Sequence, residues 1–170
     1  MLIRTESPAD ILQIDALLKA TFETDAEAKL VMQLRENSRF TLSMVACSDE
    51  GEIIGHLLFT PVTIDGMDIG WQGLAPLAIA PKYQGQGVAR KLIEAGFDSL
   101  FEFGYPACFV LGDPQFYSRF GFVDATALGF TSLYHELPYY QAGAFQVISF
   151  VDDLLPQFKG LVEYTPEFAP

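Results

Sequence analysis

The chain has 170 residues, close to the usual size of one domain, so we expect a single domain over residues 1–170. Hydrophobic residues make up 50% of the chain and 14% of it is aromatic, which excludes a mostly disordered protein. The net charge of -12 disfavours a general nucleic-acid binder and favours cationic partners such as amines, although the same charge could serve solubility alone.

The first forty residues predict one short strand and two helices. Residues 2–5 read as a strand. Ser7 offers an N-cap for a helix over 8–20, in which apolar residues recur at helical spacing. A second helix is expected to start at Thr24, with Glu27 three residues later completing a capping box.

Strands predominate in the rest of the chain, and we expect them at 41–48, 53–64, 69–80, 106–111, 145–150 and 161–164. Asp65-Gly66 is a hairpin signal, and Pro76 removes a donor from its strand, which predicts local splaying. Helices are expected at 87–103 and 114–120. This order predicts a mixed α/β (α+β) sheet flanked by helices, with a core at 1–125 and C-terminal strands plus an aromatic loop at 126–170.

The two cysteines, Cys47 and Cys108, lie in apolar runs and are predicted to be small core residues. No Cys/His cluster has metal-ligand spacing, so we expect no metal. The longest apolar stretch, at 53–62, is far short of the roughly 20 residues that span a bilayer. The first ten residues lack the apolar segment of a secretory signal, so we expect a cytoplasmic protein that does not associate with membranes.

A strand, a glycine-containing loop and a helix follow one another between Leu77 and Arg90. Glycines let the backbone approach a ligand closely, and the free N–H groups at a helix N-terminus attract an anion. No acidic residue occurs in 69–93, where the chain average predicts about three. These features predict a pyrophosphate cradle, against the alternative of a tight turn before an ordinary helix. The sequence has neither a P-loop nor a complete GxGxxG motif, because Arg90 stands where the third glycine would be.

The sequence from Gln84 to Ala89 matches the (Gln/Arg)-x-x-Gly-x-(Gly/Ala) signature of GCN5-related N-acetyltransferases (the GNAT family). The segment 77–81 resembles that family's fourth strand, which is splayed, and 116–122 resembles its Tyr-x-x-x-Gly-Phe element. The segment 74–78 and the aromatic C-terminal part look closest to the YhbS-like branch. The resemblance implies an acetyl-CoA-dependent enzyme that acetylates a primary amine of a small molecule or peptide by direct attack.

The resemblance also implies particular roles for residues of this chain. The backbone of the signature loop would bind the pyrophosphate of acetyl-CoA, through Gln84, Gly85, Gln86, Gly87, Val88, Ala89 and Arg90. The pantetheine arm would pair with the backbone of the preceding strand, at Leu77, Ala78 and Ile79. Tyr117 matches the tyrosine that protonates the departing thiolate, although it could also be a core aromatic residue. Homodimers are common in this family, so both monomer and homodimer stay open.

The sequence departs from the family at the general base. Many members carry a glutamate on the fourth strand, but 70–75 contains no acid. The alternatives are His56, Glu23, Glu27, Asp113 or a chain of waters and carbonyls, and each of these side chains has a simpler structural explanation. The missing acid also leaves open a second function, a non-catalytic acyl-CoA-binding or regulatory module.

Overall fold

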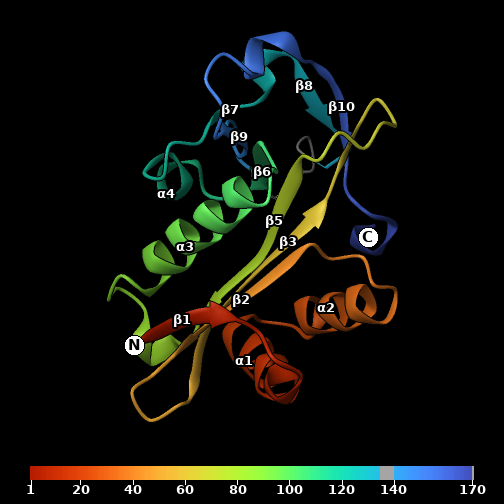
Figure 1. Cartoon of the computed structure of the whole chain (residues 1–170). Coiled ribbons are helices and arrows are strands. Elements are labelled where there is room, and N and C mark those ends of the chain that lie inside the picture. Colours follow the sequence, from red (N-terminus) through yellow and green to blue (C-terminus); the bar gives the residue numbers. More distant parts are fainter. Residues whose placement is uncertain (135–139, 170) are drawn as a thin grey trace. The chain divides into compact units, whose positions relative to one another are not determined.

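The computed structural model describes residues 1–134 and 140–169. By their internal contacts these residues form two compact units. The first unit comprises 1–59, 75–99 and 166–170, and the second comprises 60–74 and 100–165. Figure 1 labels the helices and strands of both units. The expectation of one domain over the whole chain stays a prediction.

The first unit starts with strand β1 (Leu2–Thr5), followed by helices α1 (Ile11–Thr21) and α2 (Ala26–Glu36). Strands β2 (Leu42–Cys47) and β3 (Ile53–Pro61) come next, and β2 pairs antiparallel with both β1 and β3. Strand β5 (Gln72–Ile79) follows β3 in the strand order, and α3 spans Val88–Glu102. Figure 1 shows α1 and α2 lying side by side, in agreement with their direct contacts.

The helices of the first unit cover both faces of its sheet. Val45 and Leu58 belong to one buried cluster with apolar residues of α1 and α2, including Ile14 and Leu34. The neighbouring positions of β3 point the other way, because side chains alternate along a strand. A Cβ atom at Gly55 would lie 2.9 Å from Leu92 Cδ1 of α3, so α3 covers that opposite face at very short range.

The second unit contains the start of β5, which pairs in parallel with β6 (Ala107–Leu111). In this pairing Gln72 lies opposite Cys108, and Leu74 lies opposite Val110. Strand β9 (Phe145–Ser149) pairs antiparallel with both β6 and β7 (Val123–Asp124). The sheet is therefore mixed, as predicted. A second, smaller sheet contains β4 (Thr63–Ile64), β10 (Gly160–Glu163) and β8 (Phe130–Ser132), in that order.

Aromatic side chains form the core of the second unit. The single tryptophan, Trp71, is 1% exposed. Its ring centroid lies 5.7 Å from those of Phe109 and Phe130 and 5.2 Å from that of Phe158. Phe145 stacks on Phe109 with centroids 5.4 Å apart. These contacts explain why a chain so rich in phenylalanine buries a compact core here.

Three local predictions are wrong. Helix α2 begins at Ala26 with Asp25 at the N-cap, so Glu27 falls at the second helical position and the capping box with Thr24 does not form. The strand expected at 53–64 breaks after Pro61, which has no N–H for the ladder, and resumes as β4. The strand expected at 69–80 starts only at Gln72, because the Gly70 N–H donates to Asp68 Oδ1 at 2.9 Å and turns the chain.

Two other sequence predictions, on the turn at Asp65-Gly66 and on the two cysteines, are confirmed. Asp65 and Gly66 both have positive φ in the turn that follows β4. Cys47 and Cys108 are buried and free. In the described part of the chain, no helix combines the length and apolar character required to cross a bilayer. Part of the aromatic segment at 134–143 lies outside the described residues.

Candidate active site

The signature loop of the first unit connects β5 to α3. After β5 the chain forms one 3-10 turn, Pro81–Tyr83, and then the exposed loop at 84–87. Gln84 Nε2 donates to the carbonyl oxygen of Ile79 at 3.0 Å, and Gln86 Nε2 donates to that of Lys82 at 3.0 Å. These two side chains fold back on the preceding backbone, while residues 84–87 are exposed to solvent.

Both glycines of the loop adopt backbone conformations that other residues avoid. Gly85 has φ +75° and Gly87 has φ +82°, and no heavy atom lies within 4 Å of a Cβ added at either position. Space beside the loop is therefore open. The first N–H groups of α3, which starts at Val88, have no partners within the helix and carry the positive end of its dipole. Such a surface can bind a phosphate group.

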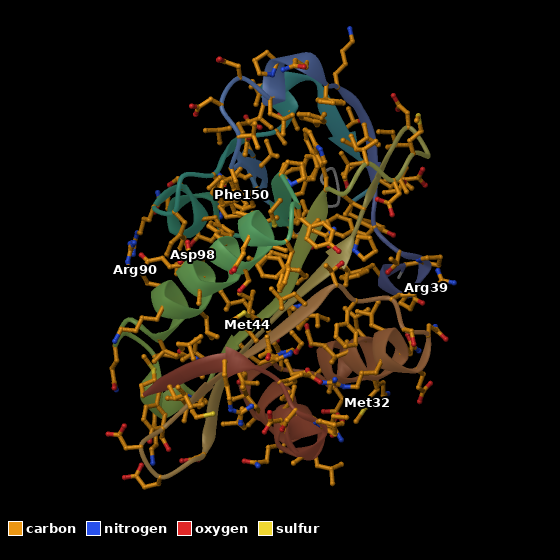
Figure 2. The ribbon with its side chains drawn as sticks, in the orientation of Figure 1. Met32, Arg39, Met44, Arg90, Asp98 and Phe150 are labelled. Carbon is orange, nitrogen blue, oxygen red and sulfur yellow. The ribbon has the colours of Figure 1, made fainter. Side chains whose placement is uncertain are left out.

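Cationic side chains flank the loop. Lys82 lies with Nζ 5.2 Å from the ring centroid of Tyr83. Figure 2 shows Arg90 at the start of α3, directed outward, and its Nη1 lies 3.3 Å from Glu94 Oε1. Both partners of this pair are about half exposed, with 51% and 59% of their side chains accessible. Arg90 can leave Glu94 and bind an anionic ligand with little loss of stability, because exposed ion pairs contribute roughly 0–1 kcal/mol.

The strand before the loop has its side chains in the protein interior. Ala78 belongs to the cluster with α1 and α2, and Ile79 Cδ1 would lie 3.1 Å from a Cβ at Gly55. Leu77 is half-buried. The side chains of Leu77, Ala78 and Ile79 thus hold the strand in place, and their predicted ligand contacts concern the backbone alone.

Tyr117 lies in the second unit, on the short helix α4 (Pro114–Ser118). Asp113 caps this helix, since its Oδ1 accepts a hydrogen bond from the Gln115 N–H at 2.9 Å. The Tyr117 ring lies edge-on to Phe122, with centroids 5.7 Å apart. It also covers Gly112, where a Cβ would lie 3.2 Å from Tyr117 Cδ2. A side chain larger than glycine at position 112 would overlap the Tyr117 ring, so the ring can lie here only because residue 112 is glycine.

The Tyr117 hydroxyl is a proton donor at neutral pH. Burial is the main cause that raises its pKa above the ordinary value of 10, and Cys108 and Asp113 contribute further. A phenol with a raised pKa stays protonated and can deliver a hydrogen bond or a proton to a developing anion. This chemistry fits the predicted role of Tyr117.

His56, considered as a base from the sequence, is a structural residue. It is 0% exposed, and its Nε2 lies 2.9 Å from Ser43 Oγ. Burial, with a contribution from Arg35, lowers its pKa to about 3. Ser43 Oγ donates to Glu6, and Arg35 donates to the same carboxylate, so the histidine ends a buried polar network. Sequence reasoning did not find this network, because its members lie far apart along the chain.

The environments of Glu23, Glu27 and Asp113 do not identify any of these acids as the general base. Glu23 is exposed, and Glu27 is half-buried with Oε2 inaccessible and without a hydrogen-bond partner among the described residues. Asp113 has the capping role described above. In the described part of the chain, no group of three or more His, Cys, Asp or Glu side chains is arranged to hold a metal ion. The base stays unassigned.

Tyr164 was not singled out from the sequence, yet its ring covers Gly73 in the second unit. A Cβ at Gly73 would overlap Cε1 of this ring and lie 2.9 Å from Cδ1. A glycine inside a strand is a known sign of close approach by another group, and Gly73 carried that signal. The partner that approaches could not be read from the sequence.

Comparison with known proteins identifies the family. Residues 40–124 match the model of the acetyltransferase (GNAT) domain. The uncharacterized N-acetyltransferase YhbS of Escherichia coli K12 is 52% identical over 171 residues, which cover 99% of this chain and 98% of the relative. A crystal structure of Escherichia coli YhbS in complex with CoA has a TM-score of 0.92 at 51% identity, and the match covers 98% of this chain and 91% of that one.

A second solved structure supports the same conclusion. A GNAT family acetyltransferase from Brucella melitensis, in complex with acetyl-CoA, has a TM-score of 0.80 at 34% identity. The match covers 99% of this chain and 97% of that one. The resemblance drawn from Gln84–Ala89 and from the segment around Tyr117 is therefore confirmed, and so is the predicted mixed sheet flanked by helices. The chain belongs to the GNAT family of acetyltransferases.

Proposed function

We propose that this acetyltransferase moves the acetyl group of acetyl-CoA to a primary amine of a small molecule or peptide by direct attack. The observation that carries the proposal is the open loop with Gly85 and Gly87 at the N-terminus of α3. It occurs in a chain that is 51% identical to a structure of YhbS bound to CoA. The expected cytoplasmic location and the choice between monomer and homodimer stay predictions.

Acetyl-CoA would be held mainly by backbone groups. The N–H groups of 85–89 would bind the pyrophosphate, with Arg90 alongside. The backbone of Leu77, Ala78 and Ile79 would pair with the pantetheine arm, and Gln84 would shape the loop through its bond to Ile79. The pyrophosphate would then lie beside residues 69–93, the longest stretch of the chain without an acidic residue, and this supports the proposal.

The reaction needs one nucleophile and one acid. The lone pair of the neutral amine attacks the thioester carbonyl carbon, a C–N bond forms, and the C–S bond breaks. The Tyr117 hydroxyl would donate its proton to the departing sulfur, so that CoA leaves as a thiol. The proton lost by the amine would pass to solvent and return to the phenolate. No side chain is assigned as the base for that transfer.

A second function is favoured by two observations. The segment 70–75 contains no acid that could act as the base, and the buried His56 has a pKa of about 3. These facts would suit a module that binds acyl-CoA without turning it over. Both functions require binding of acetyl-CoA, and only the first requires release of CoA in the presence of an amine.

Binding is tested by calorimetry and thermal unfolding with acetyl-CoA, with ATP and NAD as controls. At 100 times Kd the ligand should stabilise the protein by about 2.7 kcal/mol. Gly87→Ala should weaken binding at least tenfold, because a methyl group enters the space where the ligand must approach. Gly104→Ala is the matched control, since Gly104 lies just beyond the other end of α3 with φ +88° and equally open space. Equal affinities of the two variants would contradict the assignment of the loop.

Catalysis is tested by measuring thiol release from acetyl-CoA with a panel of primary amines. Tyr117→Phe should lower kcat at least tenfold and leave the Kd of acetyl-CoA unchanged, since only the proton donor is lost. Tyr105→Phe, a half-buried tyrosine before β6, is the control. Binding of acetyl-CoA without thiol release from any amine would favour the non-catalytic module.

A further inference from the structure

Tyr164 and Gly73 form a matched pair in the second unit. Tyr164 directly follows β10, and its ring lies against the bare backbone of Gly73 on β5. A Cβ at Gly73 would also lie 3.2 Å from Val62 Cγ1, so nothing larger than glycine leaves room there. Tyr164 itself is half-buried, which leaves part of the residue accessible to solvent.

Tyr117 likewise covers a glycine, Gly112, which comes one residue after the end of β6. Gly73 pairs with Phe109 on β6, and Gly112, which Tyr117 covers, comes three residues after Phe109. With strands about 4.8 Å apart and a rise of about 3.3 Å per residue, the two glycines lie roughly 11 Å apart. The phenols of Tyr117 and Tyr164 also interact with each other, so the two side chains lie in the same region of the second unit.

Tyr134 extends this group, since its ring centroid lies 6.3 Å from that of Tyr164. Tyr134 and Tyr117 are also half-buried. Burial, followed by the neighbouring Cys108 and the phenols of Tyr140, Tyr117 and Tyr134, raises the pKa of Tyr164. Tyr117 and Tyr164 therefore offer aromatic faces and neutral hydroxyls, and Tyr134 adds a further aromatic face. We refer to Tyr117, Tyr134 and Tyr164 as the tyrosine cluster.

The charge of the second unit indicates which ligands this cluster prefers. Among the described residues of the unit, the basic ones are Arg119 and Lys159, and the acidic ones are Asp65, Asp68, Glu102, Asp113, Asp124, Asp152, Asp153 and Glu163. Alkylamines carry a positive charge at neutral pH, as the lysine side chain does with a pKa of about 10.4. Aromatic faces attract cations, and a negative field raises their local concentration.

We propose that Tyr164 is a specificity-determining residue of the acceptor site and that the acceptor is a cationic alkylamine without a carboxylate group. The proposal rests on the proposed function, which places the sulfur of acetyl-CoA beside Tyr117. The amine must reach the carbon next to that sulfur, so groups beside Tyr117 are within its reach. An acceptor with a second positive charge therefore binds more tightly than a monoamine, and an acceptor with a carboxylate instead of that second charge binds more weakly.

The test uses three probes of equal chain length: 1,5-diaminopentane, pentylamine and 5-aminopentanoate. Their Kd values are measured by calorimetry on the CoA-loaded protein, which requires no turnover. The diamine should bind most tightly, and 5-aminopentanoate should bind at least tenfold more weakly. Tyr164→Leu should weaken the diamine at least tenfold, and Tyr164→Phe, which keeps the ring, should weaken it less. Gly73→Ala, which displaces the ring without removing it, should resemble Tyr164→Leu.

Two controls keep the outcomes separate. Fluorescence of Trp71, which is buried in the same unit, shows whether each variant folds, and Tyr105→Phe should bind all three probes as the parent does. Tighter binding of 5-aminopentanoate, no binding of the diamine, or an unchanged Kd in both folded Tyr164→Leu and folded Gly73→Ala would overturn the inference. Diamine binding that depends on Tyr164 without any acetylation would uphold a binding site for cationic amines at Tyr164, and it would refute the proposed transfer reaction and with it the role of that amine as acceptor.

Discussion

Replacing His56 by glutamine should remove a specific part of the acid sensitivity of this protein. The imidazole is fully buried and its Nε2 lies 2.9 Å from Ser43 Oγ. Burial lowers its pKa from 6.5 to about 3, so the folded state holds it neutral over most of the acidic range. The unfolded chain, by contrast, protonates it near pH 6.5. Lowering the pH through this window therefore stabilises only the unfolded state.

The magnitude follows from the two pKa values. With a folded pKa of about 3 and an unfolded pKa of 6.5, the linkage relation gives a loss of about 2 kcal/mol between about pH 7.5 and about pH 5. That loss is a large fraction of the 5–15 kcal/mol that typically stabilises a domain. Asp10 loses its own contribution at lower pH, since a hydrogen bond from Arg4 lowers its pKa from 3.8 to about 2.

The assay is urea unfolding at several pH values, followed by circular dichroism and by fluorescence of Trp71. The helices α1 and α2 lie in the unit of His56, whereas Trp71 lies in the other unit, so the two probes also show whether both units unfold together. His56→Gln should lower stability at neutral pH but lose about 2 kcal/mol less than the parent on acidification. His135→Gln replaces the other histidine and is the control. Parallel slopes for the parent and His56→Gln would refute the reasoning.

Two further changes test the packing of the first unit by the same urea assay. Gly96→Ala places a Cβ 2.9 Å from Phe59 Cζ and 3.1 Å from Leu57 Cδ2, so it should cost about 1–3 kcal/mol by overpacking, and a gain in stability would show that α3 can shift. Arg35→Met leaves Glu6 without its cation although both side chains are only 12% exposed, so it should cost roughly 3 kcal/mol. The double variant Arg35→Met, Glu6→Leu should recover part of that loss, and no recovery would contradict a penalty from an unpaired charge.

Most elements could be predicted because their signals are local. The helical spacing from Ile11 to Leu18 and the hairpin at Asp65-Gly66 depend only on neighbouring residues, and both are confirmed. The start of α2 was misplaced because Thr24 and Asp25 are both good N-caps, and local patterns do not choose between them. Short strands such as β7 and β8 carry too few residues for a period to show.

The candidate site could be predicted where a motif is contiguous. Gln84 to Ala89 and the segment around Tyr117 identify the family because each spacing is fixed within a few residues. The contact of Tyr164 with Gly73 joins positions about ninety residues apart, and the bond of Ser43 to His56 joins two strands. Such pairs depend on register and tertiary packing, which one sequence does not reveal.

Strand β5 shows how one element can serve two separate chemical tasks. Its first residues, Gln72 to Leu74, belong to the second unit, where the bare Gly73 makes room for Tyr164. Its last residues belong to the first unit and lead through the Gln84–Gly87 loop to the N-terminus of α3. If the two proposals hold, Gly73→Ala changes the affinity for amines and not for acetyl-CoA, and Gly87→Ala does the reverse. The two glycines carry no functional group, and they act through different properties of the backbone. Gly73 leaves space for the ring of Tyr164, whereas Gly87 combines open space with a positive φ that other residues rarely adopt.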